Sequence, residues 1–190
     1  MGTTFDQLDE KLIKWIEQQH LFFVATAPLA ADGLVNCSPK GLDSFAVLDS
    51  RTVMYADLNG SGIETAAHLN ENGRIVIMFC AFQGPPRILR LAGRGEYLSP
   101  GHPDFDDLAG RCDLKPLRGI VRVTLTRIAD SCGFGVPKYE FLEQRQALVE
   151  WGNRKSPEQL RAYQRENNRL SIDGLPGVQV PDTDPPSIDS

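Results

Sequence analysis

Hydrophobic side chains near the start of the chain recur every three or four residues. This spacing places them on one face of a helix, as in an amphipathic helix that covers a core. The side chains concerned are Phe5, Leu8, Leu12, Trp15 and Ile16. The pattern therefore predicts a helix over residues 4–19. Thr4, followed three residues later by Gln7, predicts a capping box at the start of that helix.

After His20 the pattern changes to short runs rich in β-branched and aromatic residues, which are typical of strands. The predicted strands cover residues 21–27, 33–38, 44–49, 52–57, 74–82, 87–98 and 119–128. The connections are mostly short, which favours an antiparallel sheet, with a hairpin joining the third and fourth strands. Seven strands within roughly 110 residues are typical of a barrel or a sandwich. Gly93 and Gly95 predict a tight bend inside one strand.

Three further helices are predicted between and after the strands. They cover residues 62–72, residues 138–153 and a segment that begins at Ser156. Ser156 with Gln159 three residues later forms a capping box, and Pro157 occupies the first helical position.

From about residue 170 the composition shifts to Gly, Pro, Asp and Ser. Such a segment buries little apolar surface. The sequence therefore predicts a single domain over residues 1–170. Residues 171–190 are expected to form an extended or disordered tail unless a partner subunit holds them.

The composition is that of a globular protein, with 41% hydrophobic and 24% charged residues. A net charge of −5 argues against a general nucleic-acid binder, which needs a basic face. No apolar run is long enough to span a membrane, and no signal peptide is evident, so we expect a cytoplasmic protein. The four cysteines and three histidines show no paired spacing, so we expect free thiols and no metal site.

Three segments carry residues suited to binding chemistry. Residues 36–44 place a lysine and small hydroxyl side chains in a turn after a strand, and residues 57–65 form a Gly-rich junction between a strand and a helix. Residues 131–139 follow the last strand with two glycines around an aromatic residue. The free N–H groups of a helix start attract phosphate. Each segment also has a plain structural interpretation: a solvated lysine, an ordinary capping box of Ser61 and Glu64, and a simple turn.

No known catalytic motif accompanies these segments. The chain has no G-x-S-x-G elbow, no P-loop, no H-E-x-x-H and no G-x-G-x-x-G after a strand. An enzyme without such signatures often takes its chemistry from a cofactor.

The ordered set of segments SPKGLDSF, YADLNGSGIETAAHLNENGRIVIMF, GPPRILRLAGRGEYL and SCGFGVPKYEF resembles the pyridoxamine 5′-phosphate oxidase-like, FMN-binding split-barrel family. The resemblance covers roughly residues 5–175. It implies a mainly β protein with flanking helices, built on an antiparallel split β-barrel. It also implies a homodimer with flavin mononucleotide (FMN) bound at the subunit interface.

The resemblance also implies roles for individual residues. Lys40 would pair with the FMN phosphate, and Arg87 would supply a second positive charge. The residues that would line the same strand as Lys40 are Ser38, Asp43, Ser44 and Phe45. Those at the helix start would be Ser61, Glu64 and Thr65. Those that would cover the flavin ring from the partner chain are Cys132, Gly133 and Phe134.

Two departures from the family pattern limit the expected activity. Gly62, Ile63 and Glu64 stand where classical members carry an Arg-Lys pair, and the classical C-terminal segment rich in Arg and Trp has no counterpart in DTDPPSIDS. We therefore expect an FMN-dependent oxidoreductase of an unidentified small-molecule substrate, rather than a pyridoxamine 5′-phosphate oxidase. The alternative is a non-catalytic dimer that binds or senses a flavin, a deazaflavin or haem.

Overall fold

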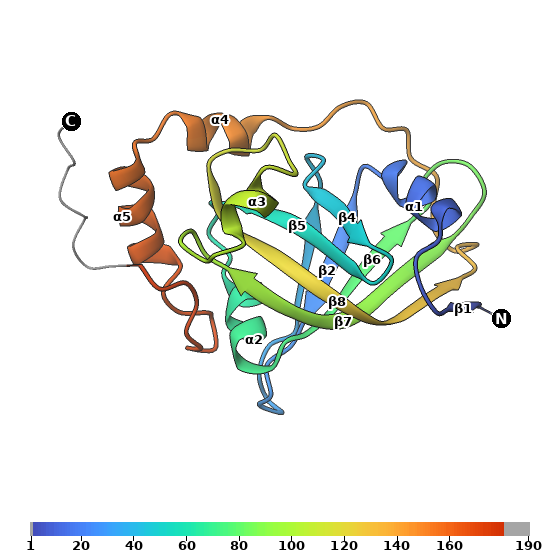
Figure 1. The fold of residues 1–190 in the computed structure, drawn as a ribbon, viewed down its shortest axis with the longest axis horizontal. Helices are drawn as coiled ribbons and strands as arrows, with labels where there is room; N and C mark the ends of the chain where they lie inside the picture. The colour runs from blue at the N-terminus through green and yellow to red at the C-terminus, as the bar shows by residue number, and fades with distance from the viewer. Residues whose placement is uncertain (1, 181–190) are drawn as a thin grey trace.

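One curved antiparallel sheet forms the body of the molecule, and helices lie around it (Figure 1). The computed structural model describes residues 2–180. The strands are β1 (Thr4–Phe5), β2 (Phe22–Thr26), β3 (Asn36–Lys40), β4 (Phe45–Asp49), β5 (Thr52–Leu58), β6 (Arg74–Cys80), β7 (Ile88–Leu98) and β8 (Leu117–Ser131). The helices are α1 (Glu10–Glu17), α2 (Glu64–Asn72), α3 (Phe105–Ala109), α4 (Ala147–Asn153) and α5 (Pro157–Asn167).

The sheet curls without closing. Its strand order is β3-β2-β6-β7-β8-β5-β4, and β1 pairs with β8. The two edge strands, β3 and β4, follow each other in sequence and are joined by residues 41–44, yet they do not pair with each other. This arrangement confirms the predicted mainly β, antiparallel fold class.

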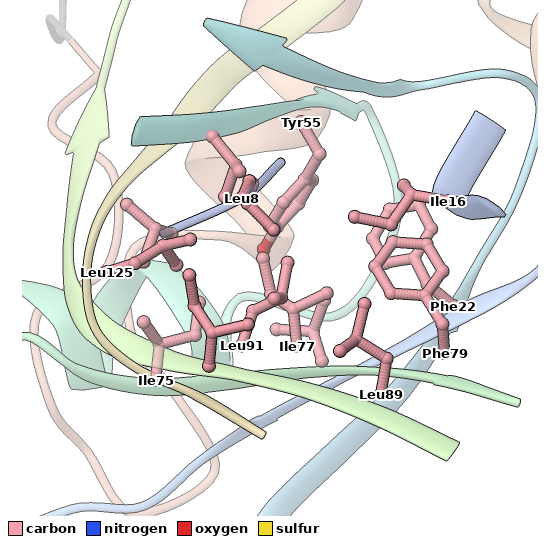
Figure 2. Packing of buried hydrophobic residues seen from close by; sticks show 14 of the residues in the cluster. Leu8, Ile16, Phe22, Tyr55, Ile75, Ile77, Phe79, Leu89, Leu91 and Leu125 are labelled. Carbon is pink, nitrogen blue, oxygen red and sulfur yellow. The ribbon is translucent and has the colours of Figure 1, made fainter. Parts of the chain in front are cut away.

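The core fills the inside of the curl (Figure 2). Alternate residues of the strands point inward, as the period of two in a strand requires. The ring of Phe22 contacts two others there: its centroid lies 5.5 Å from that of Phe79 and 5.7 Å from that of Tyr55. Leu12 and Ile16 of α1 are buried in the same cluster. One face of α1 therefore packs against the core inside the sheet.

Gly93 marks an irregularity in the longest strand pair. The register between β7 and β8 shifts between Ala92 and Gly93. A Cβ atom at Gly93 would meet the backbone of Thr124, so only glycine allows the strands to approach this closely. The sequence predicted a tight bend inside this strand, and what the structure has at Gly93 is a shift of register.

The first helix is shorter than predicted. Thr4 and Phe5 pair with β8, and the helix begins at Glu10. The predicted capping box of Thr4 and Gln7 is wrong, because the Asp9 carboxylate accepts the hydrogen bond from the Leu12 N–H at 2.8 Å. The hydrophobic face was predicted correctly, but Thr4 and Phe5 form a short strand and the helix starts only after Asp9.

The predicted helix over residues 138–153 is also wrong for its first half. Only Ala147–Asn153 is helical, and residues 132–146 cross the molecule without regular structure from the end of β8 to α4 (Figure 1). Phe141 stacks on His20 with ring centroids 3.8 Å apart, and the Gln144 side chain donates to the His20 carbonyl. These contacts to His20, just before β2, hold the segment in an extended path instead of a helix. The predicted capping box of Ser156 and Gln159 is confirmed at the start of α5.

The segment after α5 returns to the domain. Val178 and Val180 are buried against Ile63 at the start of α2, so the expectation that this segment buries little is wrong for these two residues. The Val178 N–H donates to the Asn168 carbonyl. Residues 181–190 of the predicted tail lie outside the described residues, and the domain boundary at residue 170 stays a prediction.

We predict that Asp9, and not Thr4, caps the first helix energetically. Replacing an N-cap carboxylate by alanine costs about 0.5–2 kcal/mol. Asp9→Ala should therefore lower the free energy of unfolding by about that amount in urea denaturation. Thr4→Ala removes an exposed side chain from β1 and should change it by less than about 0.5 kcal/mol. A larger loss from Thr4→Ala than from Asp9→Ala would contradict the assignment.

Candidate functional site

Strand β3 presents polar side chains to the inside of the molecule. Asn36, Ser38 and Lys40 are half-buried, whereas Cys37 and Pro39 between them are exposed. The alternation follows from the period of two in a strand. Three polar side chains on an inward face are unusual for a core strand, and they indicate a site rather than packing.

The start of helix α2 lies beside these side chains. Its N-cap residue is Ile63, and no side chain caps the first amides. The predicted capping box of Ser61 and Glu64 is therefore wrong: Glu64 Oε2 instead accepts from the backbone N–H of Ile63 at 3.0 Å. The first N–H groups of a helix have no intrahelical acceptor, so this end of α2 favours an anion. Thr65 lies in that first turn.

These elements line one cavity of about 380 Å³, which we call the Lys40 cavity. This volume lies within the range of small-molecule sites. The polar residues that line it are Ser38, Lys40, Ser44, Tyr55, Asp57, Glu64, Thr65, Tyr97 and Arg118. The structure thus brings together five of the predicted site residues: Ser38, Lys40, Ser44, Glu64 and Thr65.

A buried carboxylate organises the wall of the Lys40 cavity. Asp57 is 4% exposed, and its Oδ2 lies 2.8 Å from the Arg118 guanidinium, which is itself 6% exposed. The Tyr97 hydroxyl donates to the same oxygen at 2.9 Å. Lys40 Nζ lies 3.5 Å from the other oxygen, Oδ1. Arg118 is therefore committed to Asp57, whereas Lys40 makes a longer contact and keeps 28% of its side chain exposed.

Gly119 allows this cluster to form. Asp57 pairs with Gly119 between β5 and β8, and a Cβ atom at Gly119 would fall on the Tyr97 ring. Glycine therefore lets the Tyr97 ring approach the β8 backbone closely, with its hydroxyl bonded to Asp57.

The cluster shifts the pKa values of its members. Burial alone would raise the pKa of Asp57, but the charges of Arg118 and Lys40 outweigh burial and lower it. Burial, reinforced by the charge of Asp57, raises the pKa of Tyr97 well above its ordinary value. At neutral pH the wall of the cavity therefore carries an ionised Asp57 and a neutral Tyr97.

Tyr55 has an unused polar group in the same cavity. The residue is fully buried, and its hydroxyl has no hydrogen-bond partner of acceptable geometry among the described residues. Burial and then the charge of Asp57 raise the pKa of Tyr55, and the nearby Thr65 hydroxyl opposes that rise. An unpaired buried hydroxyl costs free energy. Its position in the cavity wall suits a polar ligand that would satisfy it.

Sequence reasoning missed four of the polar residues of this cavity: Tyr55, Asp57, Tyr97 and Arg118. Asp57 lies in a segment that the sequence analysis selected, but nothing in the sequence pairs it with Arg118, 61 positions away. The polar interruption of an otherwise apolar strand was the only available signal.

Asp43 and Phe45 lie in a neighbouring cavity of about 580 Å³, which shares Gly41 and Ser44 with the Lys40 cavity. Leu42 and Asp43, between the two cavities, have φ values of 62° and 52°. Non-glycine residues in this left-handed region store of order 1–3 kcal/mol of strain, which clusters at functional sites.

Ser61 belongs to the turn before α2 and does not line the Lys40 cavity. The buried Asn168, which follows α5, donates to the carbonyl oxygens of Gly60 and Ser61. Arg118 also donates to the Gly60 carbonyl at 2.8 Å. The turn is therefore held from the C-terminal side of the chain, and Ser61 contributes its backbone to this bracing.

The remaining predicted residues lie elsewhere in the chain. Arg87 pairs with Asp130 at 2.8 Å and covers the Trp15 ring, and it lines a third cavity together with Cys132. Gly133 lies against the Arg87 backbone, and Phe134 is 83% exposed. These four residues thus lie near one another. The β7–β8 ladder places Ile88 opposite Ser131 at this end and Leu98 opposite Ile120 at the other, so Arg87 and Arg118 lie at opposite ends of the strand pair.

Within residues 2–180, no three His, Cys, Asp or Glu side chains lie close enough to hold a metal ion. The four cysteines are free, and Cys80 is buried as a small hydrophobic residue, as the sequence predicted. None of the described helices has the length and apolar character needed to cross a membrane.

Comparisons with known proteins agree with this architecture. Residues 8–132 match the family model described as pyridoxamine 5′-phosphate oxidase. The pyridoxamine 5′-phosphate oxidase family protein ustO of Aspergillus flavus is 38% identical over 196 residues, which cover 94% of this chain and 78% of that protein.

Two solved structures show the same fold. The HupZ protein of Group A Streptococcus is 25% identical with a TM-score of 0.50, and the match covers 64% of this chain and 91% of that one. A Lactobacillus delbrueckii protein that carries the pyridoxamine 5′-phosphate oxidase name is 16% identical with a TM-score of 0.52, over 66% of this chain and 97% of that one.

We predict that Asp57 makes the fold sensitive to acid. Its pKa is lowered on folding, so the unfolded state binds the proton more readily. The stability that this shift provides is complete above the unfolded pKa of about 3.9 and is lost as the pH falls through the lower folded value. Asp57→Asn should remove this part of the pH dependence. It should also cost about 3–5 kcal/mol at neutral pH, because the Arg118 charge is left unpaired.

The control is Asp104→Asn, which breaks an ion pair between Arg122 and a carboxylate that is 51% exposed. An exposed pair contributes at most about 1 kcal/mol. Urea unfolding at several pH values measures both variants. Equal losses at neutral pH for Asp57→Asn and Asp104→Asn would contradict the central role of the buried pair.

Proposed function

The chain belongs to the pyridoxamine 5′-phosphate oxidase family, and we propose that it binds FMN, with the phosphate in the Lys40 cavity, as an FMN-dependent oxidoreductase of a small-molecule substrate. The observation that carries the proposal is the convergence of Lys40, the Thr65 hydroxyl and the uncapped start of α2 on one cavity. These are the groups that a phosphate monoester needs: a cation, a hydroxyl donor and free backbone amides.

Lys40 supplies the charge that the phosphate would meet. Arg118 is used by Asp57, whereas Lys40 Nζ stands 3.5 Å from that carboxylate and is partly open to the cavity. The nearly buried Arg118 and Asp57 fix the wall against which the Lys40 side chain lies. A charge-assisted contact of this kind contributes roughly 1.5–3 kcal/mol.

The helix start adds a weaker attraction. The amides at the beginning of α2 would donate to phosphate oxygens, and the helix dipole contributes roughly 0.3–1 kcal/mol at an exposed site. Glu64 opposes the phosphate from the same turn, although one of its oxygens is occupied by the Ile63 N–H. Because Gly62, Ile63 and Glu64 replace an Arg-Lys pair, we expect this phosphate site to be weaker than that of classical family members.

The bound FMN would supply hydride and electron transfer. The chain's own residues would position it and exclude water. Tyr55 and Tyr97 stay protonated at neutral pH because burial raises the pKa of each well above its ordinary value. Tyr55 can therefore donate a hydrogen bond in the cavity, whereas Tyr97 already gives its proton to Asp57, and neither takes up a proton from a substrate.

We further propose that the protein is a homodimer with the flavin at the subunit interface. Phe134 and Leu142 are each 83% exposed and lie in the same irregular segment between β8 and α4, where a partner subunit would cover them. Arg87, Cys132, Gly133 and Phe134 lie away from the Lys40 cavity of their own chain, so a role in covering the flavin ring would require the cavity of the partner. Four free thiols favour a cytoplasmic location.

We predict that the purified protein binds one FMN per chain. After excess FMN and gel filtration, flavin absorption near roughly 375 and 450 nm, a property of the cofactor itself, should co-elute with protein. The complex should elute at twice the mass of the 21.0 kDa chain. Reduction of the bound flavin and reoxidation by candidate acceptors would then test catalysis.

Other results would contradict the proposal in distinct ways. A colourless protein that retains no FMN would overturn it. A Soret band or a tightly held deazaflavin would favour a non-catalytic binding dimer. If flavin co-elutes with a monomer of 21.0 kDa, the proposal that the chain binds FMN stands and the proposed site at a subunit interface is overturned.

Lys40→Ala should weaken FMN binding by about tenfold or more, because it removes the charge that faces the phosphate. Binding of riboflavin, which lacks the phosphate, should hardly change. Lys11→Ala removes an exposed lysine of α1 and serves as the matched control. Quenching of flavin fluorescence measures both affinities. An unchanged FMN affinity in Lys40→Ala would exclude Lys40 as the phosphate ligand.

A further inference from the structure

Asn36 is the centre of a hydrogen-bonded chain that ends in the Lys40 cavity. Its Nδ2 donates to Thr65 Oγ1 at 3.0 Å and to Thr26 Oγ1 at 3.1 Å. Its Oδ1 accepts from Ser38 Oγ at 2.9 Å. Thr65 and Ser38 both line the cavity, whereas Asn36 does not. One amide thus contacts two hydroxyl groups that are candidates for binding the phosphate.

The direction of these hydrogen bonds distinguishes the two hydroxyls. Because Thr65 Oγ1 accepts from Asn36, Thr65 keeps its own proton and can donate it to a phosphate oxygen. Ser38 has no proton left to donate to a phosphate, because it gives its single hydroxyl proton to Asn36 Oδ1. Toward an anion, Thr65 therefore offers a proton and Ser38 offers only lone pairs.

The far side of Asn36 is fixed in the interior. Thr26, opposite Asn36 in the β2–β3 register, is buried and lies 2.9 Å from Nδ1 of the buried His68 in α2. Burial lowers the pKa of His68, so the imidazole is neutral near pH 7. The network therefore joins β2, β3 and α2, and the Asn36 amide has little freedom to turn away from Thr65.

We propose that Asn36 is a positioning residue for the FMN phosphate: it fills one lone pair of Thr65 Oγ1, so that the Thr65 proton is directed at the phosphate, and it withdraws the Ser38 proton from the site. This inference rests on the proposed function, since it concerns the same cavity. It makes Thr65, and not Ser38, the hydroxyl donor to the phosphate.

A double-mutant cycle between Asn36 and Thr65 tests the proposal. FMN and riboflavin affinities are measured by fluorescence quenching for wild type, Asn36→Ala, Thr65→Val and the double variant. We expect about a tenfold loss of FMN affinity in Thr65→Val, equal to about 1.4 kcal/mol, and a smaller, roughly three- to tenfold loss in Asn36→Ala. The double variant should be no weaker than Thr65→Val, because Asn36 acts through Thr65.

Matched measurements separate positioning from folding. Riboflavin affinity should change little across the cycle, and the thermal midpoint measures separately the stability that each variant loses with its hydrogen bonds. Thr65→Ser, which keeps the hydroxyl, should restore most of the FMN affinity that Thr65→Val loses. Ser38→Ala should cost less FMN affinity than Thr65→Val. In combination with Lys40→Ala, Asn36→Ala should instead be additive, because Lys40 binds independently of the network.

The possible failures are distinguishable. Wild type that binds neither flavin would overturn the proposed function and this inference with it. If wild type binds FMN, additive losses in Asn36→Ala and Thr65→Val would overturn the inference alone. So would equal losses of FMN and riboflavin affinity in Asn36→Ala, or a larger loss in Ser38→Ala than in Thr65→Val.

Discussion

The ion pair between Asp57 and Arg118 is the constraint on which the candidate site depends. Two buried charges are tolerated in a protein interior only when they meet each other and find further hydrogen bonds. Here Tyr97 of β7 completes the shell of Asp57, and the Gly60 carbonyl takes another guanidinium hydrogen. The pair therefore ties β5, β7 and β8 to the turn that precedes α2. Lys40 joins from β3, across the split between the two edge strands, so the same carboxylate that neutralises Arg118 also contacts the Lys40 ammonium.

The cavity beside this wall explains why β3 carries polar side chains on its inward face. A strand that alternates Asn36, Ser38 and Lys40 on its inward face would be destabilising if it packed against the core. In this fold Ser38 and Lys40 line a cavity instead, and Asn36, behind them, binds the hydroxyls of Thr26, Ser38 and Thr65. The cavity thus has a charged wall set by Asp57 and a neutral hydrogen-bonding wall set by Asn36. Lys40 contacts Asp57 and offers a positive charge to a phosphate, whereas Thr65 contacts Asn36 and offers a hydroxyl donor.

The parts that the sequence predicted are those that depend on local pattern. Alternation placed the strands within a few residues, and the face of α1 that contains Leu12 and Ile16 is the one that is buried. The errors arise where a distant segment decides the outcome. Thr4 pairs with Ala129 instead of capping a helix, and Gln144 bonds to the His20 carbonyl in a segment whose spacing is helical. The site divides in the same way. Lys40 and Thr65 lie in recognisable motifs, whereas the role of Arg118 depends on a partner 61 positions away.

The separation of the remaining predicted residues bears on the assembly. Arg87 lies at one end of the β7–β8 ladder with its charge used by Asp130, and the Lys40 cavity is formed with Arg118 from the other end. Because Arg87 and the Lys40 cavity lie at opposite ends of this strand pair, they do not bind the same ligand molecule within one chain. If Arg87 and Phe134 contact the flavin as the family resemblance implies, the contact is made with the flavin of the partner. The sites would then be completed only on dimerisation, and flavin binding and subunit association would stabilise each other by mass action.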